Sequence, residues 1–134
     1  MVRIEEADWV ETHREEIMKY QVMLNNLPED SKIQRIELLS KQLVFIGKLA
    51  AGFSEEYKRI YATRKREHAE AYIKAPTSKA AYAELAVADL RELEAEAYGN
   101  MKRWNNAFES TKEEINALKY HVKVDIEDGS SRQR

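Results

Sequence analysis

The chain contains no cysteine, and only two prolines and four glycines occur among its 134 residues. The absence of cysteine excludes disulfide bonds, thiolate catalysis and cysteine-based zinc sites, and it fits a reducing cytoplasm. So few glycines and prolines leave little material for the turns of a sheet protein. No run of about eighteen apolar residues and no signal-peptide core is present. We therefore expect a cytoplasmic protein that does not enter the membrane.

Motifs for catalysis or metal binding are missing as well. The three histidines, His13, His68 and His121, belong to no H-E-x-x-H motif, and no Glu-x-x-His pair is present. The chain also lacks a nucleophile elbow and a glycine-rich phosphate loop. The sequence therefore predicts a protein that is not an enzyme and that uses no metal or cofactor.

Charged residues are abundant but balanced. They make up 34% of the chain, against 43% hydrophobic residues, a mixture typical of long exposed helices. The length suffices for one domain. The formal net charge of −2 gives no overall attraction for nucleic acid, so any such binding must come from local patches.

Apolar spacing indicates two long helices that fold back on each other at the Ala-Pro-Thr-Ser sequence of residues 75–78. In residues 32–74, apolar side chains recur with alternating gaps of three and four, the pattern of a coiled-coil seam. The members of this seam are Ile36, Leu39, Leu43, Ile46, Ala50, Phe53, Tyr57 and Ile60. Thr77 or Ser78 is expected to cap the following helix.

The following helix, predicted from the turn at residues 75–78 to residue 124, has a similar seam. Its members are Ala83, Ala86, Leu90, Leu93, Ala97, Met101, Trp104, Phe108, Thr111, Ile115, Leu118 and Val122. Ala97 and Met101 are four residues apart, whereas the alternation of three and four predicts a spacing of three at this point. Such an insertion predicts a stutter, which unwinds a supercoil locally without ending the helix.

A shorter helix is predicted over residues 2–27, with an apolar stripe on one side. The stripe consists of Val10, His13, Ile17, Tyr20, Leu24 and Leu27. The early half of the long second helix has an extra apolar face, made of Leu38, Phe45, Leu49 and Gly52, on which the first helix is expected to pack.

These patterns predict an all-α fold with a three-helix base and a long antiparallel coiled-coil hairpin. The single domain spans residues 1–126, with the base formed by residues 1–53 and 100–126 and the hairpin prong by residues 54–99. Residues 127–134 are polar and contain Asp-Gly-Ser-Ser, so they are expected to be a disordered tail.

One stretch of the second helix concentrates positive charge. Its five basic residues are Lys58, Arg59, Arg64, Lys65 and Arg66. Tyr57 and Tyr61 are interleaved with them. Positive side chains bind phosphates with release of counterions, and tyrosine rings stack on unpaired bases. The cluster therefore predicts a sequence-tolerant site for single-stranded nucleic acid.

A second interpretation of this cluster stays open. In an antiparallel hairpin, residues 58–66 face residues 87–95, where Asp89, Glu92 and Glu94 lie. Some of the basic side chains can then neutralise neighbouring acids, with little gain for each exposed pair. Residues 64–66 span nearly a full helical turn, so they cannot all face the acidic helix.

The order of features along the chain has a counterpart among known proteins. A short first helix precedes a long basic second helix, and the third reads Ala88-Asp89-Leu90, Trp104, Ser110, Ile115 and Leu118-Lys119. This layout resembles the UvsY-type recombination mediators of T-even-like phages over most of the chain. Residues 62–66, Ala-Thr-Arg-Lys-Arg, are similar to the basic segment with which that family binds single-stranded DNA. The slightly acidic total charge and the tail after Ile126 depart from the family.

The resemblance implies a homo-oligomeric ring of small helical subunits. Such a mediator makes and breaks no bond; it helps a recombinase displace single-strand-binding protein from DNA. The implied partners are single-stranded DNA, the recombinase and the single-strand-binding protein, inside an infected bacterium. The competing interpretation is a coiled-coil adaptor or assembly scaffold that acts only through protein contacts.

Overall fold

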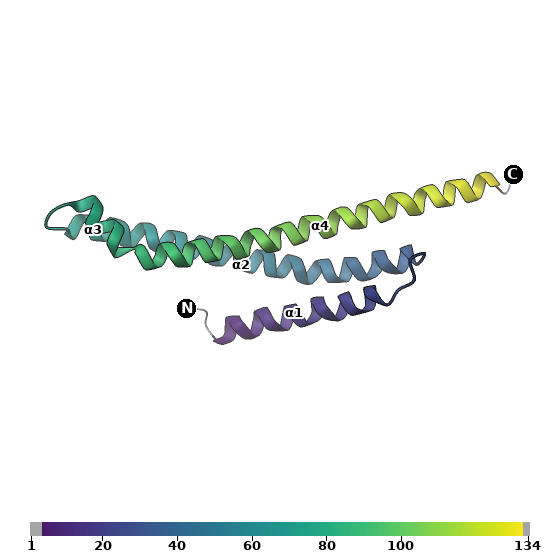
Figure 1. Cartoon of the computed structure of the whole chain (residues 1–134), viewed down its shortest axis with the longest axis horizontal. Helices are drawn as coiled ribbons and strands as arrows, with labels where there is room; N and C mark the ends of the chain where they lie inside the picture. The colour runs from purple at the N-terminus through teal and green to yellow at the C-terminus, as the bar shows by residue number, and fades with distance from the viewer. Residues whose placement is uncertain (1–3, 133–134) are drawn as a thin grey trace. The chain divides into compact units, whose positions relative to one another are not determined.

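The computed structural model describes residues 4–132, with the side chains of residues 8–129. This part of the chain is all α-helical and contains no strand, which confirms the predicted fold class. Its helices are α1 (Ile4–Asn25), α2 (Lys32–Lys74), α3 (Lys79–Ala86) and α4 (Ala88–Arg132) (Figure 1). None of them has an apolar stretch long enough to cross a membrane. The predicted bounds of α2 are confirmed, while the predicted start of the first helix at residue 2 lies outside the described residues.

The contacts within the chain divide it into two compact units. Unit 1 consists of the chain up to Leu49 together with the chain from Asn105 onwards, and unit 2 is Ala50–Trp104. Both α2 and α4 therefore contribute one part to each unit. The sequence places the corresponding boundaries a few residues away, at residues 53–54 and 99–100.

Three helices meet in the core of unit 1. Leu24 of α1, Leu39 of α2 and Ile115 of α4 form a buried cluster, each with 6% of its surface exposed or less. Partly buried neighbours complete it: Leu27, Ile36, Leu38, Leu43 and Leu118. The predicted stripe of α1 lies on this side, since all six of its residues are buried or half-buried.

The contact between α1 and α2 is partly polar. Figure 1 shows α1 running beside the first part of α2. Phe45, from the extra apolar face of α2, packs on Tyr20, with ring centroids 6.1 Å apart. Next to it Gln42, only 4% exposed, donates hydrogen bonds of 3.1 Å to the backbone carbonyl of Ile17 and to Oε1 of Gln21. Gln42 therefore fixes how α1 sits on α2.

Gln42 gives a stability test with two substitutions. Gln42→Ala should lower the free energy of unfolding by about 2 kcal/mol, because it removes both hydrogen bonds and leaves a cavity. Gln42→Leu fills the same space, and Gln21 can turn to water, so this variant should stay within about 1 kcal/mol of the native protein. Urea denaturation measures both. Equal losses in the two variants would contradict the assigned role of Gln42.

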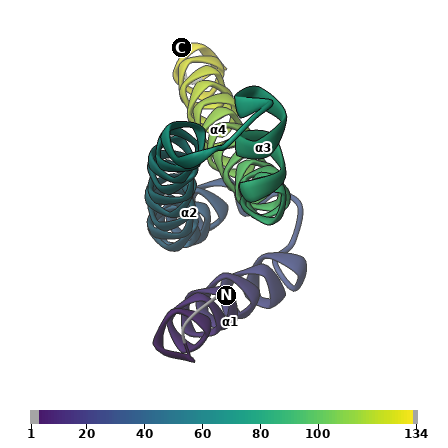
Figure 2. The same cartoon turned by 90° about the vertical axis from the view of Figure 1, so that its left-hand side faces the viewer.

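Unit 2 is built from the second half of α2, the short α3 and the beginning of α4. Phe53 stacks on Trp104 with ring planes 6° apart, and Tyr57 lies against Tyr98. Further along α2, His68 pairs with Glu84. Residues further along α2 thus pair with residues that come earlier in the following part of the chain. The two segments therefore run in opposite directions. Figure 2 faces the end of this unit and shows α3 as a separate short helix after the loop at residues 75–78.

The predicted continuous third helix is interrupted at Val87. This residue has φ −110° and ψ 11°, outside the α-helical region, and it separates α3 from α4. Its carbonyl still accepts a hydrogen bond of 2.9 Å from the backbone N–H of Arg91, which starts α4. The side chain of Val87 is completely buried, whereas Ala86, the predicted seam residue, is exposed. Val87, the larger of these two apolar side chains, therefore occupies the buried position that was predicted for Ala86.

The same shift removes the predicted stutter. Leu93, the next predicted seam residue, is 37% exposed, and Glu94 is half-buried in its place. The buried and half-buried seam positions are Ala83, Val87, Leu90, Glu94, Ala97, Met101 and Trp104. Their gaps alternate between four and three without interruption. The predicted stutter was wrong because only apolar residues were assigned to the seam. In the structure one seam position is occupied by Glu94.

Two predictions about ends of helices also differ from the structure. Ser78 is the N-cap residue of α3, but it has a left-handed backbone with φ 47°, and its side chain makes no capping hydrogen bond. The expected disordered tail begins at residue 127, yet α4 continues to Arg132. Extending an existing helix costs much less than nucleating one, so α4 propagates into this polar segment. Residues 133 and 134 of that tail lie outside the described residues.

Candidate nucleic-acid interface

Arg64 lies on the buried stripe of α2, four residues after Ile60. Its Nε donates to one carboxylate oxygen of Glu94, and its Nη2 donates to the other over 3.3 Å. The two side chains are only 13% and 15% exposed. The hydrogen bond to Glu94 raises the pKa of the Arg64 guanidinium, which therefore stays charged. Arg64 is thus a structural cation, held within unit 2 by its own acid.

Three tyrosines form a row beside this ion pair. The ring centroid of Tyr57 lies 5.5 Å from that of Tyr98 and 6.3 Å from that of Tyr61. Tyr57 is half-buried, whereas Tyr61 and Tyr98 are 38% and 45% exposed. The row therefore has a half-buried centre and two accessible ends.

Each accessible ring has a cation over it. Nζ of Lys65 lies 5.0 Å from the centroid of Tyr61, and Nζ of Lys102 lies 5.8 Å from that of Tyr98. Both lysines are exposed. We call this surface the tyrosine–lysine face; it consists of Tyr57, Tyr61, Lys65, Tyr98 and Lys102.

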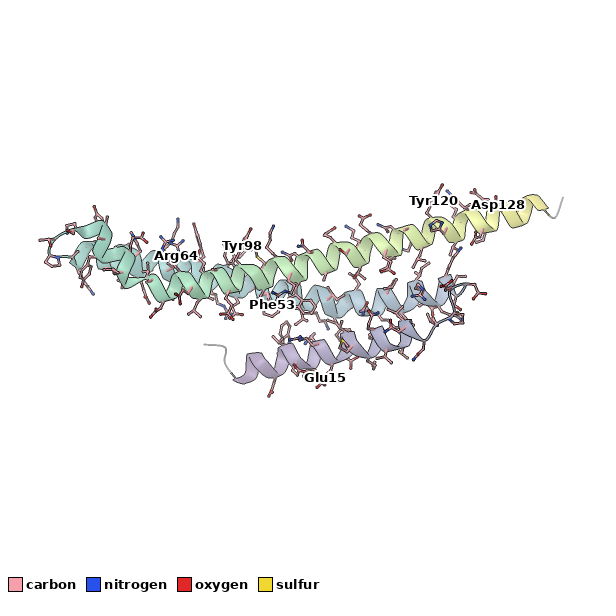
Figure 3. The ribbon with its side chains drawn as sticks, viewed as in Figure 1. Glu15, Phe53, Arg64, Tyr98, Tyr120 and Asp128 are labelled. Atoms are coloured by element: carbon pink, nitrogen blue, oxygen red, sulfur yellow. The ribbon has the colours of Figure 1, made fainter. Side chains whose placement is uncertain are left out.

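Two grooves of unit 2 adjoin the face. The first, of about 250 Å³, is lined by Tyr57, Arg91, Glu94, Ala95 and Tyr98. The second, of about 320 Å³, is lined by Arg64, Lys65, His68, Glu84 and Arg91. Arg91 lines both grooves, so it links the tyrosines to the basic side chains. Figure 3 labels Arg64 and Tyr98 in this part of the structure.

Ion pairs set the charge of the second groove. Arg91 and His68 both contact the carboxylate of Glu84. The hydrogen bonds donated by Arg91 lower the pKa of the Glu84 carboxyl, so this acid is ionised at neutral pH. Lys65 supplies a further positive charge. Within the described residues, no group of three potential ligands is arranged to hold a metal ion.

The structure separates the five predicted basic residues. Arg64 and Lys65 both lie over the ring of Tyr61 and line the same groove. Lys58, Arg59 and Arg66 are exposed. Among the described residues, no cation–π contact joins Lys58 or Arg66 to a tyrosine of the face. The alternative interpretation holds for Arg64, whose charge is neutralised by Glu94.

Sequence reasoning missed the contribution of α4 to this surface. Tyr98 and Lys102 are four residues apart in the sequence. Helical side chains with this spacing lie on the same side of the helix, so their pairing could have been predicted. Arg91 had no such signal, because its position between the two grooves depends on the break at Val87.

Comparisons with known proteins identify no relative of this chain. The chain matches no family model, and the searches of curated proteins and of solved structures find no match. The function proposed below therefore rests on the residues of the tyrosine–lysine face and on the layout of the sequence.

Proposed function

We propose that this protein binds single-stranded DNA through the tyrosine–lysine face of unit 2. The observation that supports the proposal is the pairing of two accessible tyrosines with lysines, Tyr61 with Lys65 and Tyr98 with Lys102. Exposed aromatic rings stack on unpaired bases, and neighbouring cations contact the phosphates between them. Every base has a flat face, so such a site tolerates any sequence.

Local arrangement, rather than total charge, has to supply the affinity. Residues 50–104 contain ten lysines and arginines against nine aspartates and glutamates. A duplex binder that depends on a broad basic surface would need a larger excess. A single strand needs only a few cations beside its stacked bases, which is what the face offers.

We further propose that the protein acts as a recombination mediator of the UvsY type. In this proposal unit 2 is an antiparallel coiled-coil hairpin and unit 1 a three-helix base through which subunits form a homo-oligomer. Each face binds weakly, and several faces in one assembly raise the avidity for one strand. Recombinase and single-strand-binding protein are the partners that the mediator would bring together on DNA.

A protein-binding scaffold is the second candidate, and one observation favours it. Helix α1 exposes four large apolar side chains, Trp9, Met18, Val22 and Met23, which are 40%, 59%, 55% and 47% exposed. Exposed apolar groups of this size are common at contacts between proteins. A scaffold would use such groups and would not bind DNA in a salt-dependent way.

A titration of a labelled oligothymidine with the full chain, followed by fluorescence anisotropy at two salt concentrations, tests DNA binding. Lys65→Ala combined with Lys102→Ala should weaken binding about tenfold at low salt and flatten the salt dependence. Tyr98→Ala should cost about 1–3 kcal/mol of binding free energy. Arg64 is kept in both variants, because its removal would disturb Glu94.

The matched control removes two exposed lysines outside unit 2, Lys119→Ala with Lys123→Ala. It changes the net charge equally and should leave the affinity nearly unchanged. Equal weakening in the two double variants would contradict the assignment of the face. Binding that is absent at low salt, with the protein well folded, would favour the scaffold.

A further inference from the structure

The groove of about 320 Å³ in unit 2 gathers positive side chains around a single acid. Arg64, Lys65, His68 and Arg91 line it together with Glu84. Arg64 is already bound to Glu94. His68 and Arg91 contact the carboxylate of Glu84, and Lys65 lines the same groove. Glu84 is the only acid that lines this groove among the described residues.

Glu84 occupies the fork of the Arg91 guanidinium. Nε of Arg91 donates to Oε2 over 2.9 Å, and Nη2 donates to Oε1 over 3.0 Å. Nε2 of His68 lies 3.2 Å from Oε1. Two parallel hydrogen bonds of this kind are the arrangement with which arginine binds either a carboxylate or a phosphate. The carboxylate oxygens therefore stand where two phosphate oxygens would fit.

The pair is accessible and easily exchanged. The side chains of Arg91 and Glu84 are 48% and 50% exposed, so solvent and ligands reach both. An exposed ion pair contributes little to stability, and opening it costs correspondingly little. A backbone phosphodiester carries one negative charge, as the carboxylate does, and presents two oxygens to the guanidinium, so it can take the place of Glu84.

Arg91 also lines the groove between Tyr57 and Tyr98. A strand with a base stacked on Tyr98 has its backbone next to that base. The phosphate that follows then comes within reach of Arg91 and of Lys65 beyond it. Stacking and phosphate binding are thus adjacent on one surface.

We propose that Arg91, Lys65 and His68 form a seat for a backbone phosphate of single-stranded DNA, and that Glu84 occupies this seat when no DNA is bound. The inference rests on the proposed function, because the strand on the tyrosine–lysine face supplies the phosphate. Binding exchanges Glu84 for the phosphate, and Glu84 turns to water. Glu84 therefore acts as an internal competitor that lowers the affinity of the face.

The substitution that tests this seat is Glu84→Gln, which keeps the shape of the side chain and removes its charge. The full chain is titrated against a labelled oligothymidine at several salt concentrations. Glu84→Gln should bind about fivefold more tightly than the native protein, because an exposed competing ion pair is lost. The slope of log K against log salt should steepen by about one, because in the native protein the displaced Glu84 carboxylate takes up a counterion that offsets one of those released from the DNA.

Glu96→Gln serves as the matched control, since Glu96 is an exposed acid of α4 that loses the same charge. A general electrostatic effect would strengthen DNA binding equally in both variants. That result would contradict the proposed phosphate seat but would leave DNA binding by the face intact. The combination Glu84→Gln with Arg91→Ala should lose the whole gain of Glu84→Gln. If neither the native chain nor Glu84→Gln binds the oligonucleotide, both the seat and the proposed function are wrong.

A second measurement does not depend on a long strand. The Nε–H resonance of Arg91, followed by NMR during titration with inorganic phosphate, should shift at lower phosphate concentrations in Glu84→Gln than in the native chain. The melting temperature of Glu84→Gln should match that of the native protein, because the residue is half exposed. A resonance that responds to phosphate equally in both proteins would overturn the competition by Glu84.

Discussion

Leu49→Ala is expected to lower the free energy of unfolding by about 3 kcal/mol. The side chain of Leu49 is 0% exposed and is one of the two largest that are fully buried among the described residues. Alanine in its place removes apolar contacts and leaves a cavity that a well-packed helical core closes only in part. The melting temperature, followed by far-UV circular dichroism, should fall by about 10 °C.

Leu85→Ala is the matched control for this prediction. Leu85 is 79% exposed, so the same chemical change should alter the free energy of unfolding by no more than about 0.5 kcal/mol. Similar melting of the two variants would mean that Leu49 does not belong to the core.

Glu94→Ala is expected to lower the free energy of unfolding by about 2 kcal/mol. It leaves the nearly buried Arg64 guanidinium without its ion-pair partner. Both side chains are less than one-sixth exposed, so water replaces the lost carboxylate poorly. Replacing both residues, Arg64→Leu with Glu94→Leu, should return the stability to within about 1 kcal/mol of the native protein, since two apolar side chains suit this position.

The measurement is thermal unfolding of the native protein and of Glu94→Ala, together with the single variants Arg64→Leu and Glu94→Leu and the double variant. The coupling energy from this cycle isolates the interaction between the two positions. Single-variant losses that simply add in the double variant would show that Arg64 and Glu94 act independently, and would return Arg64 to the set of candidate DNA contacts.

The sequence predicted the helices better than it predicted their faces. Alternating gaps of three and four placed α2 from Lys32 to Lys74 and identified its buried stripe correctly. The same rule failed on the following helix, where Ala86 and Leu93 were chosen over Val87 and Glu94. An acid on a buried stripe is stable only with a partner, and that partner, Arg64, comes from a distant part of the chain.

The basic cluster of the sequence overlaps the proposed face only in part. Two of its members, Arg64 and Lys65, lie at Tyr61. A single helix could not reveal that α4 supplies Tyr98 and Lys102, because the pairing of the two segments decides which residues meet. The ion pairs of Arg64 and Arg91 likewise depend on side-chain positions that spacing alone does not give.

The shortness of α3 has a consequence for the dynamics of the molecule. A helix of eight residues is not stable alone in water, and Ala83 is its only buried residue within the described part of the chain. Local opening of α3 therefore costs less than unfolding of the long helices, as amide hydrogen exchange would register. Glu84 departs with α3, while Arg91 stays on α4 beyond the break at Val87. Thermal fluctuation of one short helix thus uncovers the guanidinium while the rest of unit 2 remains folded.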